Sequence, residues 1–216
     1  MKRLNTTPLS RFAGLCAGLL LMAGCSSLLT GEAPPDSRYQ LVPVSATPPP
    51  TASAQGFRPS LFVQLGTVGL GLTGDRIVAR DPQRVTPIKG LRWVEPTNDL
   101  IEKTLTRHLE QSGLFSYVTG QKGGPPTDLV LVVDLRALYV NLENQAPESV
   151  DVALSLRLID RLQKQPLGIA VLSEHEPLKG TDATAIIRGF QTAASRLLSQ
   201  VTAELRQDLA SQSPSA

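Results

Sequence analysis

Residues 129–140 read LVLVVDLRALYV, and they alternate with the two-residue period of a β-strand. The odd-numbered residues fall on one face and the even-numbered residues on the other. The first face carries Leu129, Leu131, Val133, Leu135, Ala137 and Tyr139. The second face carries Val130, Val132, Asp134, Arg136, Leu138 and Val140. The first set has no charged residue, so the pattern predicts that it faces the core.

The same alternation returns in the next segment. Five apolar residues are predicted to point inward: Val150, Val152, Leu154, Leu156 and Leu158. Asp151, Ser155 and Arg157 lie between them and point outward. A neighbouring strand is marked by Leu167, Ile169 and Val171. Only residues 161–166 separate the two strands, which predicts an antiparallel hairpin.

Two helices are predicted. In the first, Asp99 is expected to be the N-cap with Glu102 three residues later, and Gly113 is expected to end the helix. The second runs over residues 184–209. Its apolar stripe comprises Ile186, Ile187, Phe190, Ala193, Ala194, Leu197, Leu198, Val201 and Leu205.

Further short strands are predicted at residues 61–65, 76–80, 91–94 and 114–118. Strands therefore cluster rather than alternate one-for-one with helices. This order predicts an α+β fold, an antiparallel sheet with two helices packed on one face. The other face of the sheet carries Asp134, Arg136, Asp151, Ser155 and Arg157, and we expect it to meet water or a partner.

The N-terminus has the layout of an export signal. Lys2, Arg3 and Arg11 flank the start of an apolar run over residues 12–22, which leads to the sequence LMAGC at residues 21–25. This stretch resembles the bacterial lipobox, with Met22 where leucine is usual. We therefore expect cleavage before Cys25 and acylation of Cys25. One alternative is an ordinary secretory signal with an incidental cysteine. The other is a membrane anchor, but the apolar run is about half of the ~20 residues that span a bilayer.

Removal of residues 1–24 leaves 192 residues with 18 basic and 19 acidic side chains. The basic balance of the full chain belongs to the signal, so it gives no argument for a nucleic-acid partner. Residues 25–58 are rich in proline and predict a linker, interrupted by a short edge strand at 39–44. We expect one folded domain over residues 59–210 and a disordered tail over 211–216.

No motif in the chain favours catalysis. Residues 69–74 match the pattern G-x-G-x-x-G, but a strand rather than a helix is expected to follow, so we interpret them as a hairpin loop. His108 and His175 have no second ligand at metal-binding spacing, and no pair of acids stands out. Trp93 either packs under a helix or anchors a partner. The chain is therefore not expected to be an enzyme.

The order of these features resembles the ABC-type transport auxiliary lipoproteins, a family that includes the lipoprotein of the paraquat-inducible system. The matching features are Cys25, the sequence YQL at 39–41, RIVAR at 76–80, Trp93 with Pro96 before the first helix, and QSGLF at 111–115. The final strand pair and the long closing helix also agree. The match covers about residues 39–209.

The resemblance implies a non-catalytic envelope component. It implies N-acyl and S-diacylglycerol groups on Cys25, no other cofactor, and residence in the outer membrane, because Ser26 is not the aspartate of inner-membrane retention. The implied partners are a permease, an ATPase and a substrate-binding protein of the mammalian-cell-entry type, with phospholipid or another hydrophobic molecule as cargo. An envelope assembly lipoprotein without a transport role and a lipid-modifying enzyme are the alternatives.

Two mechanisms are open for such a protein. In the first, the domain docks the transporter at the outer membrane through the outward sheet face and exposed strand edges, with Asp134, Arg136, Asp151 and Arg157 as candidate contacts. In the second, it carries lipid in a cavity between helices and sheet.

Overall fold

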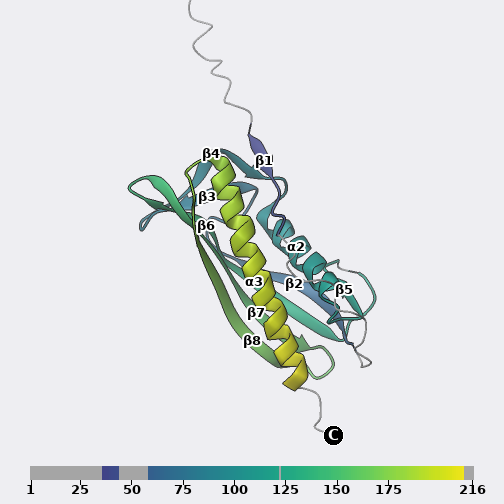
Figure 1. The fold of residues 1–216 in the computed structure, drawn as a ribbon. Coiled ribbons are helices and arrows are strands. Elements are labelled where there is room, and N and C mark those ends of the chain that lie inside the picture. The colour runs from purple at the N-terminus through teal and green to yellow at the C-terminus, as the bar shows by residue number, and fades with distance from the viewer. Residues whose placement is uncertain (1–35, 44–57, 122, 212–216) are drawn as a thin grey trace, which may run out of the picture. The chain divides into compact units, whose positions relative to one another are not determined.

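A computed structural model describes residues 36–43, 58–121 and 123–211 (Figure 1). The elements are β1 (Ser37–Tyr39), β2 (Ser60–Val68), β3 (Arg76–Arg80), β4 (Val85–Trp93), α2 (Thr97–Ser112), β5 (Tyr117–Thr119), β6 (Leu129–Glu143), β7 (Ala146–Asp160), β8 (Gln165–Pro177) and α3 (Ala183–Ser211). The expected signal peptide, Cys25, Ser26, most of the linker and residues 212–216 lie outside the described residues.

Strand β6 is the axis of the sheet. One edge of β6 pairs antiparallel with β7 along nearly its whole length, and β7 pairs with β8 in the predicted hairpin. The other edge of β6 pairs first with β2 and then with β3, both parallel. β5 extends the sheet beyond β2, while β4 and then β1 extend it beyond β3.

The prediction of an antiparallel sheet is therefore wrong, because the sheet is mixed. β1–β4, β2–β5, β2–β6 and β3–β6 are parallel pairs, whereas β3–β4, β6–β7 and β7–β8 are antiparallel. The expected hairpin at residues 69–74 does not exist. This segment instead carries the chain along one edge of β6, with the Gly69 amide donating to the Leu135 carbonyl at 2.8 Å and Leu72 buried in the core.

A bulge in β6 reverses its faces. Leu135 lies opposite Leu154 of β7 and Ala137 lies opposite Ala153, so Arg136 is an extra residue without a partner across the ladder. Before the bulge the odd-numbered residues of β6 face the helices, as predicted. After it the even-numbered Leu138 and Val140 take that place. The prediction that Ala137 and Tyr139 continue the helix-facing side is therefore wrong, although both side chains are buried.

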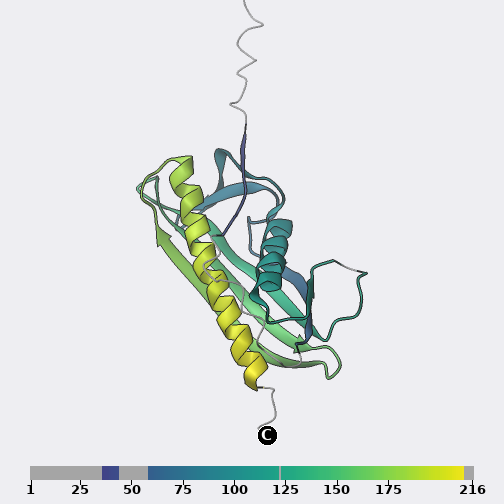
Figure 2. The same cartoon turned by 45° about the vertical axis from the view of Figure 1, so that its right-hand side comes forward.

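Both helices lie on the same face of the sheet, as predicted (Figures 1 and 2). The predicted apolar stripe of α3 is buried throughout. Trp93 is also buried, and its ring meets Phe190 of α3 edge-on with centroids 5.4 Å apart. Trp93 is thus a core residue, and the interpretation that it anchors a partner is wrong.

The ends of three elements differ from the prediction. α2 begins at Thr97 instead of after an Asp99 cap, since the Thr97 amide and hydroxyl both donate to the Gly74 carbonyl at 2.8 Å. Gly113 ends α2 in the left-handed conformation (φ 68°), as predicted. The strand expected at 114–118 is β5. An edge strand, β1, exists near the one expected at 39–44, but the two share only Tyr39. Residues 40–43 are not in a strand, and Leu41 enters the core.

Leu154 of β7 and Leu197 of α3 test this packing, because each is only 2% exposed. We expect Leu154→Ala and Leu197→Ala each to lower the free energy of unfolding by about 2–5 kcal/mol, since each leaves a cavity between sheet and helix. Thermal and urea denaturation measure the loss. Leu70→Ala is the control, because Leu70 is 92% exposed. Near-parental stability of both core variants would contradict the assigned faces.

Candidate partner-docking surface

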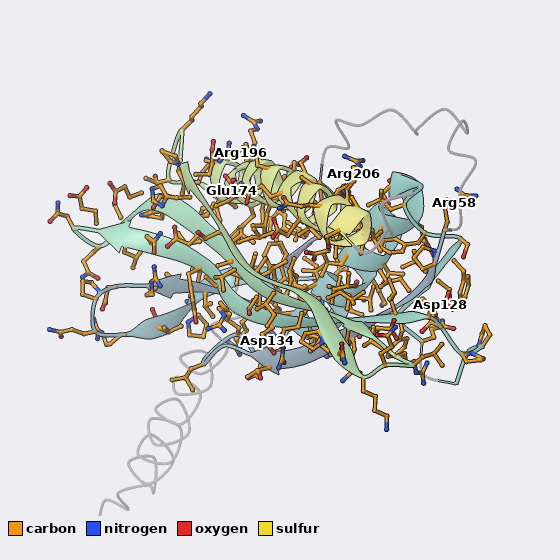
Figure 3. All side chains as sticks on the ribbon, turned by 90° about the horizontal axis from the view of Figure 1, so that it is seen from below. Arg58, Asp128, Asp134, Glu174, Arg196 and Arg206 are labelled. Carbon is orange, nitrogen blue, oxygen red and sulfur yellow. The ribbon has the colours of Figure 1, made fainter. Side chains whose placement is uncertain are left out.

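The candidate contact residues lie on the sheet face that the helices leave uncovered. Asp134 on β6 points away from α2 and α3 (Figure 3). Asp151 and Arg157 occupy outward positions of β7, as predicted, and Arg136 stands at the bulge. The structure therefore places all four residues on the helix-free side of the sheet, but it gives each a different role.

The Asp134 carboxylate interacts with residues of its own sheet. Its Oδ1 accepts the Thr67 amide at 2.7 Å, where the β2–β6 register shifts between Leu65 and Val68. Its Oδ2 lies 3.6 Å from Arg157 Nη2 of β7. Asp134 thus links three strands and satisfies an amide that the irregular ladder leaves without a carbonyl. We assign it a structural role.

Asp151 belongs to a polar cluster at the other end of this face. Arg80 Nη2 of β3 lies 2.7 Å from Asp151 Oδ2, and His175 Nδ1 of β8 lies 2.7 Å from Asp151 Oδ1. The Arg80 guanidinium also stacks over the Tyr139 ring, 5.1 Å from its centroid. Sequence reasoning missed Arg80, Tyr139 and His175 as neighbours of Asp151. Only the bulge at Arg136 brings Tyr139 to this face.

Arg136 and Arg157 are the two cations among the four candidates, and both are accessible to solvent. Arg136 is exposed, and no acidic residue of the described chain forms an ion pair with it. Arg157 has 48% of its side chain exposed despite its neighbour Asp134. Within the described residues, no group of three His, Cys, Asp or Glu side chains could hold a metal ion. The arrangement is suited to contact with a partner.

The space between helices and sheet is nearly filled. The cavity there has a volume of only about 20 Å³ and is lined mainly by apolar side chains, among them Leu105 of α2, Leu154 of β7 and Leu197 of α3. Larger hollows, up to about 430 Å³, lie open on the surface. Pockets for small ligands usually enclose ~300–1,000 Å³. The cavity between the helices and the sheet, as lined by the described residues, is therefore too small for an acyl chain.

A surface groove of about 200 Å³ runs between α2 and α3. His108 of α2 is half-buried in its wall, and its Nε2 lies 2.8 Å from the Thr202 hydroxyl of α3. Burial lowers the pKa of His108 below its usual value of 6.5, and a contact with the Leu198 backbone opposes this only in part. The packing of α2 against α3 therefore favours the neutral form of the His108 imidazole.

The sequence matches the family model of the ABC-type transport auxiliary lipoprotein component over residues 39–216, and the chain belongs to this family. It is therefore an auxiliary lipoprotein component of an ABC-type transport system, anchored to a membrane of the cell envelope. This family is not a known enzyme family. Neither described helix combines the length and the hydropathy needed to cross a bilayer. No curated protein sequence matches the chain.

Solved structures support the fold. A crystal structure of a protein from Xanthomonas campestris assigned to family DUF330 has a TM-score of 0.65 at 20% identity, covering 81% of this chain and 99% of that one. A second structure, of an uncharacterised protein, has a TM-score of 0.59 at 15% identity and covers 81% and 99%. A lipoprotein from Neisseria meningitidis has a TM-score of only 0.34 at 12% identity, covering 71% of this chain and 100% of that one.

The lowered pKa of His108 predicts a pH dependence of stability. Above pH 6.5 the imidazole is neutral in both states. As the pH falls below 6.5, the unfolded chain takes up the proton more readily, so the folded state loses stability until the pH passes the folded pKa. We expect His108→Gln to lose less stability than the parent between pH 7 and pH 5, measured by urea denaturation. Equal losses in the two proteins would contradict this account.

Proposed function

We propose that this protein is an outer-membrane lipoprotein that docks a mammalian-cell-entry-type ABC transporter at the outer membrane, as an accessory component of lipid transport between membranes. Membership of the auxiliary lipoprotein family supports a role beside a permease and an ATPase. The lipobox supports acylation of Cys25, and Ser26 after it supports release to the outer membrane. Two or three acyl chains, at ~0.8 kcal/mol for each buried methylene, give a stable anchor, whereas one chain alone holds only marginally.

The closed interior is the observation that favours docking over lipid carriage. A carrier has to shield an acyl chain, whereas the cavity under the helices measures only about 20 Å³. The apolar stripes of α2 and α3 are committed to the core. The outward sheet face and the strand edges are therefore the surfaces left for a partner, and phospholipid is the cargo of the system as a whole.

The segment between Cys25 and β1 supports the same mechanism, because β1 pairs with β4 and Leu41 lies in the core, so the tether ends where β1 begins. A flexible segment of about ten residues has an r.m.s. span of about 17 Å, and a proline-rich one reaches further. A domain held on such a tether meets a periplasm-spanning partner at high effective concentration. A modest direct affinity is then enough to keep the end of the transporter at the outer membrane.

Photo-crosslinking in cells tests this proposal. We expect photoreactive residues in place of Arg136 or Arg157 to crosslink to the substrate-binding protein of the transporter, because both side chains are accessible on the outward face. A probe in place of Arg107, which is exposed on α2, is the control. Cys25→Ala should weaken the crosslink severalfold, because the chain loses its tether.

Two results would contradict the proposal. Crosslinks that join Arg136 and Arg157 only to other envelope proteins would point to an assembly lipoprotein. Recovery of the Cys25→Ala chain in the membrane fraction, with unchanged mobility on a gel, would overturn the acylated anchor.

A further inference from the structure

Strand β8 is an unusually long free edge. It pairs with β7 over 13 residues, and no described strand pairs with its other side. The opposite ends of the sheet are β1 and β5, each of three residues. A free edge presents a row of backbone donors and acceptors that another chain can use.

The first half of this edge has none of the charges that normally protect free strands. Between Gln165 and Ser173 the sequence PLGIAVL contains no charged residue. Ile169 and Val171 are 67% and 65% exposed on the outward face, where Arg157 and Ser155 of β7 are their neighbours. The strand predicted from Leu167, Ile169 and Val171 is therefore present as β8. Ile169 and Val171, however, point away from the helices.

The helix side of the same segment is acidic. Asp208 of α3 lies directly on Gly168, so close that a Cβ there would stand 2.0 Å from Asp208 Oδ2. Glu204 lies one turn earlier on α3, and no described lysine or arginine forms an ion pair with either carboxylate. Burial, followed by the charge of Glu204, raises the pKa of Asp208. No cation is among the causes of this shift, which agrees with the absence of an ion pair to Asp208 among the described residues.

The second half of β8 also has acidic side chains beside α3, but there a cation pairs with them. Glu174 and Glu176 also face α3, and both bind Arg196, with N–O distances of 2.6 and 2.7 Å (Figure 3). The two halves of β8 thus differ in their ion pairs although both lie beside α3. Arg196 pairs with both acids at one half, whereas no described lysine or arginine forms an ion pair with the acids at the other half.

We propose that residues 165–173 of β8 receive an extended segment of a partner protein as an added strand, with branched aliphatic side chains beside Ile169 and Val171 and lysine or arginine side chains beside Glu204 and Asp208. Alternate residues of a strand point to opposite faces, so a segment that alternates these two types meets both requirements. This inference rests on the proposed docking function and names the kind of segment that docks.

A second copy of this chain fits the edge poorly. The helix-facing residues of this part of β8 are Gly168, Ala170 and Leu172, none of which is basic. A two-fold pairing of β8 with itself would also place two α3 helices side by side on one face of the joined sheet. Their Glu204 and Asp208 carboxylates would then add like charges to the same region.

Synthetic peptides test the inference with the full chain in detergent. The probe is a fluorescent nine-residue peptide that alternates lysine with isoleucine or valine, and its control carries glutamate in place of lysine. We expect fluorescence anisotropy to show at least about tenfold weaker binding of the glutamate peptide. Hydrogen exchange should show protection of amides within residues 165–173 when the lysine peptide is bound.

Variants separate this site from general attraction of a basic peptide. We expect Ile169→Lys and Asp208→Asn each to weaken binding about tenfold. Leu70→Lys makes the same kind of change at a still more exposed apolar residue, and Glu148→Gln removes one exposed acid elsewhere. Both controls should bind the lysine peptide as the parent does.

Several outcomes would overturn the inference. These are equal binding of the two peptides, equal loss with Glu148→Gln and Asp208→Asn, or protection outside β8. Self-association of the parent that Ile169→Lys abolishes, seen by analytical ultracentrifugation, would assign the edge to a second copy. Crosslinks to the transporter together with no peptide binding would refute this inference alone, whereas peptide binding without such crosslinks would refute the docking function alone.

Discussion

A β-bulge in β6 decides which of its residues face the core. Leu135 lies opposite Leu154 of β7 and Ala137 lies opposite Ala153, so Arg136 is an extra residue in β6. The bulge rotates the rest of β6 by one position. Leu138 and Val140 then continue the core face opposite Val152 and Val150, while Tyr139 turns outward to Arg80. The bulge also lies where β2 ends and the segment toward β3 begins, so one irregularity organises the core, the fork of the sheet and the outward polar cluster.

The two faces of the sheet differ in character: one is packed against the helices and the other is exposed. The helix side is packed around Trp93, Phe190 and the stripe of α3, and it leaves only a small cavity. The outward side keeps a polar network, two accessible arginines and an unprotected edge strand. A filled interior and an exposed outer face favour the proposed docking role over lipid carriage, and the chain belongs to a family of auxiliary transport components.

Local patterns allowed most elements to be predicted from the sequence. The strict alternation at residues 150–158, the stripe of α3 and the helix stop at Gly113 each follow from neighbours in the chain. The inward residues of β7 and α3 and the C-terminal end of α2 were therefore predicted correctly, although Ser155, expected to be accessible, is buried. Family membership was also predicted, because it depends on the order of such features.

The mixed sheet was not predicted, because strand partners are decided by contacts far apart in the sequence. The glycines at residues 69–74 are typical of a hairpin loop, yet Leu72 finds a place in the core and the chain continues along β6. The bulge at Arg136 leaves the alternating pattern intact in the sequence. The outward direction of Ile169 depends on its register with Arg157, which no local pattern encodes.

The lipid content of the purified protein tests the central claim most directly. Native mass spectrometry of the full chain, extracted in mild detergent, reports whether phospholipid remains bound beyond the acyl groups on Cys25. A filled helix–sheet interior predicts the mass of the acylated chain alone. One phospholipid retained per chain, lost when Leu154 or Leu197 is changed to a bulkier residue, would show that the interior opens for lipid and would contradict a docking role without carriage.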